Sequence, residues 1–165
     1  MSRAFVNEDQ AADQADQPVE RRISEQPNYV TGSGLRQLQT RVAELNALRS
    51  ELQAQGEQGD KQRLADTERD LRYFSARVQS AQVVPAATSH SKVQIGSRVR
   101  FVDAHDQEQV VRLVGEDEAD AGHGLINWGS PLGRALLGAG PGDEVVWRRP
   151  VGEQVIEVVE ILGEG

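Results

Sequence analysis

Apolar residues recur at helical spacing in two consecutive stretches of the chain. Successive apolar positions are three, four, three and seven residues apart in the first stretch, and seven, three, four and three apart in the second. This is the a/d spacing of a coiled-coil seam, so each stretch predicts an amphipathic helix. The first seam consists of Leu35, Leu38, Val42, Leu45 and Leu52, and the second of Leu64, Leu71, Phe74, Val78 and Ala81.

The boundaries of the two helices are also marked in the sequence. Thr31 and Ser33 offer N-cap hydroxyls before the first seam, and Pro85 follows the second, where a helix should have stopped. Gly56 and Gly59 interrupt the chain between the seams, and glycine favours turns over helices. We therefore expect an antiparallel coiled-coil hairpin. The alternative is one unbroken helix that pairs with a second copy of the chain.

The hydrophobic period changes beyond about residue 93. A short helix is predicted there, with Ser130 as its N-cap, Pro131 at its first position and Gly138 at its end. The C-terminal part is expected to be a small α+β domain, in which this one helix lies on a curved antiparallel sheet. Runs of β-branched and aromatic residues mark five strand candidates, at 98–101, 110–114, 125–128, 145–147 and 155–161.

The distribution of charge follows the same divisions. Residues 1–26 carry a net charge of −3, residues 35–83 of +1 and residues 92–165 of −6, within a total of −8. The acidic start is poor in large apolar side chains, which is typical of a disordered leader, although it could also be an interaction tail. The predicted regions are a leader at 1–28, a coiled-coil finger at 29–84, a linker at 85–92 and a C-terminal domain at 93–165.

Composition excludes several classes of protein. The chain has no cysteine, so it has no disulfide framework, thiol nucleophile or thiolate metal site. A net charge of −8 argues against direct binding to duplex DNA, which needs a basic surface, and favours a protein partner. The sequence has neither an apolar run of about 18 residues nor the apolar stretch of a secretory signal. We expect a cytoplasmic protein without a membrane contact.

Several blocks of the sequence resemble the Gre family of bacterial transcript-cleavage factors. The segment 28–38 resembles the opening of the family's coiled coil, and 80–83 resembles its close. The C-terminal blocks follow one another in the family's order and spacing; they are 114–120, 125–126, 130–137 and 142–144. The resemblance covers the chain from Tyr29 to its end, and implies a coiled-coil finger followed by a C-terminal domain with an FKBP-like fold.

The resemblance also implies a partner and a reaction. In the family, the C-terminal domain docks on RNA polymerase at the mouth of the secondary channel, and the finger reaches toward the active centre. Two acids at the finger tip, in an Asp-x-x-Glu pattern after a glycine, help to hold a second Mg²⁺ there. The polymerase then hydrolyses the 3′ end of backtracked nascent RNA. A factor of this kind is accessory to the polymerase, and has neither an enzymatic centre nor a cofactor of its own.

The tip motif is only partly present in this chain. Gly59 and Asp60 match it, but Arg63 stands where the motif has its second acid. Because a cation repels Mg²⁺, Glu57 is the candidate for the second metal ligand beside Asp60. Both acids could equally be solvated side chains of a turn. The arms on either side of the tip are shorter than the resemblance leads us to expect, so the finger is predicted to be a shortened one.

The docking loop of the family precedes the short helix, and typically carries an acid followed by Ser-Pro. Here Gly129 takes the place of the acid before Ser130 and Pro131. Trp128 and Arg134 flank this loop and complete the predicted polymerase-binding set. Helix capping alone would also explain Ser130 and Pro131.

Three functions remain open on the sequence. The chain could rescue backtracked complexes by stimulating RNA cleavage, or occupy the secondary channel without cleavage as a competitor of other factors. The third possibility is a coiled-coil homodimer or adaptor that makes no contact with polymerase.

Overall fold

The structure is a computed structural model in which residues 19–163 are described. These residues form two compact units. One unit contains residues 19–25 and 38–79, and the other contains residues 26–37 and 80–163. Most of the predicted leader, residues 1–18, lies outside the described residues.

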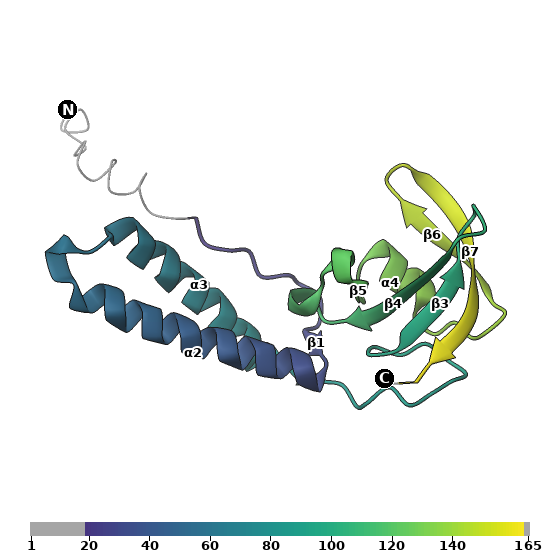
Figure 1. The fold of residues 1–165 in the computed structure, drawn as a ribbon, viewed down its shortest axis with the longest axis horizontal. Coiled ribbons are helices and arrows are strands. Elements are labelled where there is room, and N and C mark those ends of the chain that lie inside the picture. Colours follow the sequence, from purple (N-terminus) through teal and green to yellow (C-terminus); the bar gives the residue numbers. More distant parts are fainter. Residues whose placement is uncertain (1–18, 164–165) are drawn as a thin grey trace, which may run out of the picture. The chain divides into compact units, whose positions relative to one another are not determined.

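Two helices form the hairpin that the apolar seams predict (Figure 1). Helix α2 (Gly32–Ala54) and helix α3 (Lys61–Ser80) are joined through the 3-10 turn η2 (Gly56–Gln58). Gly56 has a φ of 59°, a left-handed conformation that glycine adopts without the steric cost of a Cβ atom. The chain therefore reverses where the sequence predicts, and the unbroken helix is excluded.

The interior of the hairpin follows the predicted seam more closely on α2 than on α3. Leu38, Leu45 and Leu52 recur every seven residues along α2 and are 2–4% exposed. On α3, Leu71 is the buried residue of the predicted seam, and it is joined by Thr67 and Arg77, which the apolar pattern did not predict. The seams are narrow because each helix covers only one face of the other. None of the helices in the described part of the chain combines the length and apolar character needed to cross a membrane.

The segment that precedes the hairpin packs along α3. The guanidinium of Arg21 lies 4.0 Å from the ring centre of Tyr73 and 3.4 Å from a carboxylate oxygen of Asp70. Glu20 forms an ion pair with Arg72. This segment belongs to the C-terminal end of the predicted leader, and it is attached to the hairpin by charge and cation–π contacts.

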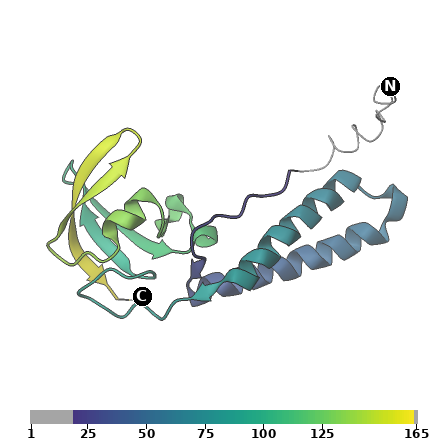
Figure 2. The ribbon, with the colours of Figure 1, turned by 180° about the vertical axis from the view of Figure 1, so that it is seen from behind.

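A five-stranded sheet forms the body of the second unit, in the order β5-β4-β3-β7-β6. Helix α4 (Pro131–Leu136) lies on the concave face of this curled sheet (Figures 1 and 2). The core between helix and sheet includes the fully buried Phe101, Leu113 and Leu136. The strands are β3 (Arg98–Val102), β4 (Glu108–Val114), β5 (Leu125–Asn127), β6 (Glu144–Arg149) and β7 (Gly152–Leu162).

The sheet is mixed, and not wholly antiparallel as the sequence led us to expect. Strand β5 runs parallel to β4, with Leu113 opposite Ile126. The connection is not a hairpin, because it passes through the 3-10 turns η3 (Glu116–Glu118) and η4 (Ala121–His123). Alternation of apolar residues predicts a strand but not its direction, which depends on the path of this connection.

A second, very short sheet joins the chain before α2 to the chain after α3. Strand β1 (Tyr29–Val30) pairs in parallel with β2 (Gln82–Val83). The amide of Gln82 donates to the carbonyl of Asn28 over 2.8 Å, and the amide of Val84 donates to that of Val30 over 2.9 Å. Pairs of two-residue strands leave no pattern in a sequence, and we did not predict this one.

Candidate functional site

Asp60 occupies the turn of the hairpin, as the sequence predicts, and has a structural role there. Its Oδ1 accepts a hydrogen bond from the amide of Arg63 over 3.0 Å, and its carbonyl accepts one from the amide of Leu64. Asp60 is therefore the N-cap of α3, because a capping side chain satisfies one of the free amides of the first turn. One carboxylate oxygen is used in this way.

Glu57 and Arg63 are the other charged groups of the tip that matter for a metal. Glu57 lies exposed in η2, and its carboxylate has no recorded partner among the described residues. Arg63 is exposed in the first turn of α3, one turn after Asp60. Lys61, next to Asp60, is exposed as well, so the tip presents two carboxylates together with two cations at its surface.

These two carboxylates suit a shared ion and not a complete metal site. Oxygen ligands are the ones that Mg²⁺ prefers, so the donor chemistry fits. Across residues 19–163, however, no three His, Cys, Asp or Glu side chains are grouped closely enough to hold a metal. Any ion bound at Asp60 and Glu57 needs further ligands from another molecule.

The predicted docking loop is a tightly built helix start. The hydroxyl of Ser130 accepts a hydrogen bond from the amide of Gly133 over 3.1 Å, and Pro131 is the first residue of α4. A Cβ atom at Gly133 would lie 2.3 Å from the carbonyl oxygen of Asn127, so only glycine allows this turn to close. Ser130 and Pro131 therefore have the capping role that the sequence left open beside the docking role.

The other residues of the predicted docking set lie around the same turn. The ring of Trp128 packs edge-on against Tyr29, with centroids 5.3 Å apart, and is half-buried. The side chain of Gln26 covers Gly129 so closely that a Cβ there would lie 2.1 Å from its Oε1. Arg134 is exposed on α4.

Two hollows flank Pro131. The first, of about 370 Å³, is lined by Arg134, Val146 and Arg148 among others. The second, of about 400 Å³, is mostly apolar and includes Leu132, Trp147 and Val151. The exposed surface around Pro131 therefore offers both apolar area and positive charge to a partner.

The turn η3 contains an acid, Glu118, that sequence reasoning missed and that contacts the start of α2. Glu118 accepts hydrogen bonds from the amide of Thr31 over 3.2 Å, from its hydroxyl over 2.5 Å and from the amide of Gly115 over 3.0 Å. Thr31 is the N-cap of α2, since its hydroxyl accepts from the amide of Gly34 over 3.0 Å. Glu118 thus fixes the first turn of α2 to η3, 87 residues further along the chain.

Two glycines make room for this carboxylate. A Cβ atom at Gly34 would lie 2.2 Å from Cδ of Glu118, and one at Gly115 would lie 2.6 Å from the carbonyl oxygen of Tyr29. Both glycines belong to blocks whose likeness to a family was noted from the sequence, at 28–38 and 114–120. The sequence signal that could have connected the two blocks is Gly34 in the first together with Gly115 and Glu118 in the second, because the glycines leave room for the acid.

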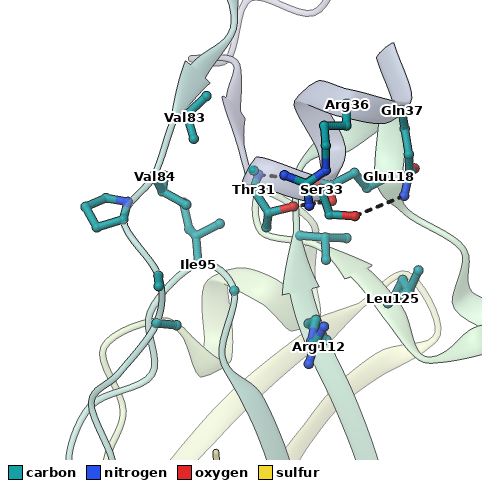
Figure 3. A pocket seen from close by; sticks show the side chains of 16 residues that line it. Thr31, Ser33, Arg36, Gln37, Val83, Val84, Ile95, Arg112, Glu118 and Leu125 are labelled. Carbon is teal, nitrogen blue, oxygen red and sulfur yellow. Dashed lines mark hydrogen bonds between the residues drawn. The ribbon is translucent and has the colours of Figure 1, made fainter. Parts of the chain in front are cut away.

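Beside this junction lies the largest pocket described, of about 480 Å³ (Figure 3). Arg36 enters it from α2 and Arg112 from β4, while Val83, Val84 and Ile95 line the opposite side. All its lining residues belong to the second unit. None of them was singled out as a ligand-binding residue from the sequence.

Comparisons with known proteins agree with the resemblance. A family model described as "Transcription elongation factor, GreA/GreB, C-term" matches residues 88–162. The transcription elongation factor GreB of Neisseria meningitidis serogroup A is 32% identical over 155 residues, which are 84% of this chain and 95% of that protein. The transcription elongation factor GreA of Nitratiruptor is 38% identical over 103 residues, which are 61% of this chain and 63% of that protein.

Among solved structures, GreA factor homolog 1 (Gfh1) of Thermus thermophilus is similar at 24% sequence identity. The match covers 84% of this chain and 100% of that chain, with a TM-score of 0.41.

Proposed function

This chain belongs to the GreA/GreB family of transcription elongation factors, and we propose that it acts on RNA polymerase from the secondary channel. In this proposal the unit that contains α4 docks at the channel rim, and the helical hairpin enters the channel with its tip toward the active centre. The factor then rescues backtracked complexes by stimulating the polymerase's own cleavage of the RNA 3′ end. The observation that carries the proposal is a two-helix hairpin whose turn presents the exposed acids Glu57 and Asp60.

The tip acids would share a Mg²⁺ with the polymerase. Such an ion supplies a nucleophilic water and stabilises the charge that develops on the phosphodiester. Asp60 would contribute its Oδ2, because its Oδ1 holds the first turn of α3. Glu57 would contribute a carboxylate that no described residue engages.

Docking is proposed to use the surface around Pro131. Gly129, Ser130 and Pro131 form the rigid turn, while Trp128 and Arg134 lie beside it. A rigid turn favours binding because little conformational entropy is lost when a partner covers it. An aromatic and an arginine side chain are typical anchors of such interfaces.

A second candidate function is occupancy of the channel without cleavage. It is supported by Arg63, which places a positive charge one turn from Asp60, and by the use of Asp60 as a helix cap. In this version the factor competes with other proteins that enter the same channel.

The test uses RNA polymerase stalled in a backtracked complex with 3′-labelled RNA and Mg²⁺. If the first function holds, the full chain releases short 3′ fragments faster than polymerase alone, and the double variant Glu57→Gln with Asp60→Asn abolishes the gain. Glu44→Gln is the matched control, since Glu44 is an exposed acid in the middle of α2. No added release, with unchanged binding to polymerase, would instead establish the second function.

Binding itself is tested separately by fluorescence anisotropy of the labelled chain with core polymerase. Arg134→Glu is expected to weaken binding at least tenfold, because it reverses a charge beside the docking turn. Lys92→Glu is the control, since Lys92 is an exposed cation outside both hollows at Pro131. Absence of any binding by the unaltered chain would refute both functions.

A further inference from the structure

Two arginines are neighbours on the face of the sheet opposite the core. Arg98 on β3 and Arg112 on β4 lie directly opposite each other in register. Like charges in this arrangement repel. Arg100, on the same face of β3, is instead ion-paired with Glu160 over 2.5 Å. The sheet also pairs Arg148 with Glu153, whereas among the described residues neither Arg98 nor Arg112 has an ion pair, and Arg112 lines the pocket.

Arg112 also has an unused donor inside the molecule. Its Nε is buried and has no hydrogen-bond partner among the described residues, as is also true of Arg49, Arg100 and Arg149. A ligand would therefore be bound through the terminal Nη groups of the guanidinium. Arg112 lines the 480 Å³ pocket beside the start of α2. The lining of the pocket thus includes a guanidinium, a group that binds anions.

Arg36 supplies a second guanidinium from another element. Its Nη1 would lie 3.6 Å from a Cβ atom at Gly32, so the side chain folds back along the first turn of α2. It lines the same pocket (Figure 3). In the described part of the chain no ion pair joins Arg36 to a carboxylate. Arg36 and Arg112 therefore approach the pocket from helix and sheet, as two guanidiniums do around a polyanion.

Glu118 is the acid of the pocket lining, and its carboxylate is held in place by uncharged donors. Its two carboxylate oxygens accept the three hydrogen bonds from Thr31 and Gly115 described above. These donors hold the carboxylate against the backbone, and among the described residues it forms no ion pair with Arg36 or Arg112.

One side of the pocket is apolar, while Thr31, Ser33 and Gln37 add polar groups to the rest of its lining. Val84, Ile95 and Leu125 are half-buried, and Figure 3 shows Val84 and Ile95 across the pocket from Arg36. A volume of about 480 Å³ lies within the range of small-molecule sites. Two cations beside an apolar wall suit a ligand with a polyanionic end and a flat, largely apolar end.

We propose that this pocket binds a nucleoside diphosphate, with its phosphates between Arg36 and Arg112 and its base against the apolar wall. The site is separate from the tip and from the surface around Pro131. It does not require that the chain act on polymerase, so the proposed function can fail while this inference stands.

The test is isothermal titration calorimetry of the full chain with ADP, at low ionic strength and with EDTA present. We expect saturable binding of one ADP per chain. Inorganic pyrophosphate should compete, because it carries the same phosphates, and adenosine should not. Added salt should weaken binding, since exposed charges are screened. No saturable heat with either ADP or pyrophosphate at millimolar concentration would overturn the proposal.

Variants locate the site. Arg112→Gln and Arg36→Gln are each expected to weaken ADP binding roughly tenfold or more, because each removes a charge-assisted contact. Arg100→Gln is the matched control, as it removes an arginine from the same sheet face that is already paired with Glu160. Arg36 is exposed on a helix, so its variant tests the site even if Arg112→Gln alters the fold. Equal loss in Arg36→Gln and Arg100→Gln would refute the pocket as the site.

The phosphate could also come from a nucleic-acid backbone. A single-stranded RNA oligonucleotide without a terminal phosphate separates the two sources, because it presents phosphodiesters and no diphosphate. We expect it not to displace ADP. Displacement by this oligonucleotide at lower concentration than by pyrophosphate would overturn the assignment to a nucleotide.

Discussion

The acids at the tip of the hairpin and the acid of η3 beside the start of α2 have opposite surroundings. Asp60 is exposed and accepts one amide, while Glu57 beside it has no recorded partner in the described residues. Glu118 is half-buried and accepts three hydrogen bonds from two residues. The comparison shows that the surroundings of an acid distinguish a structural role from a binding role. Glu118, with both carboxylate oxygens hydrogen-bonded, fixes the fold, whereas Asp60 and Glu57 keep oxygens available to a partner.

The largest effect on stability is expected when the carboxylate of Glu118 is displaced from its hydrogen bonds. Gly34→Ala places a Cβ atom 2.2 Å from the carboxylate carbon, so Glu118 must leave and its hydrogen bonds are lost. We expect a loss of about 2–3 kcal/mol in the free energy of unfolding. Urea unfolding followed by tryptophan fluorescence measures it, since Trp128 and Trp147 both lie in this unit.

Two further variants isolate the cause. Gly32→Ala is the matched control in the same turn, because its Cβ would meet only Arg36 at 3.6 Å; it should be neutral or slightly stabilising. In a chain that already carries Glu118→Ala, Gly34→Ala should cost almost nothing. Additive losses in the double variant would show that Glu118 is not the reason for glycine at position 34.

At the tip, the capping and metal-binding roles of Asp60 can be separated. Asp60→Ala should cost about 1 kcal/mol, because α3 loses its N-cap, whereas Asp60→Asn should keep the cap. Urea unfolding followed by circular dichroism at 222 nm reports this loss. If the first proposed function holds, both variants lose cleavage stimulation although only one loses stability. Equal stability of the two variants would contradict the capping role.

A smaller effect is expected on the sheet. Arg98→Gln removes one of two like charges that face each other across β3 and β4. We expect a gain of a few tenths of a kcal/mol, which should fall at high salt. Arg100→Gln breaks the ion pair with Glu160 and should show no gain. A loss of stability in Arg98→Gln would mean that its charge is balanced by a group not considered above.

The smallest effect concerns the segment along α3. The hydrogen bond from Arg72 holds the pKa of Glu20 below the ordinary value of a glutamate. The pair is therefore formed at pH values above that ordinary value, and is lost as the pH falls through the lowered pKa. NMR titration of the Arg72 side chain should show this midpoint, and Arg72→Gln should restore the ordinary pKa of Glu20. An ordinary midpoint in the unaltered chain would contradict the contact.

The helices and the short α4 were predictable because their signals are local. Leu38, Leu45 and Leu52 repeat at seven-residue spacing, and Ser130 with Pro131 marks a helix start within two residues. These patterns depend on neighbours along the chain, which a sequence displays directly. The hairpin and the α+β class followed from them.

The direction of β5 and the role of Glu118 were not predictable in the same way. Both depend on the path of residues 115–124 through the fold, and no hydrophobic periodicity in the sequence specifies that path. The pocket was not predicted for the same reason, since Arg36 and Arg112 are 76 positions apart in the sequence and line one pocket only in the folded chain. At the tip, the resemblance indicated Asp60, and Glu57 was proposed as the substitute for the acid missing at Arg63. The capping hydrogen bond of Asp60 could be known only from the structure.

The short pairing of β1 with β2 has a consequence for how the molecule can evolve. Hydrogen bonds donated by Gln82 and Val84 connect the chain where it enters the helices to the chain where it leaves them. Everything between these strands is an insertion whose ends are already tied together. Lengthening or shortening it changes the entropy of a closed loop only slowly. The hairpin is therefore a cassette, and arms of another length can be exchanged into this chain without redesign of the sheet.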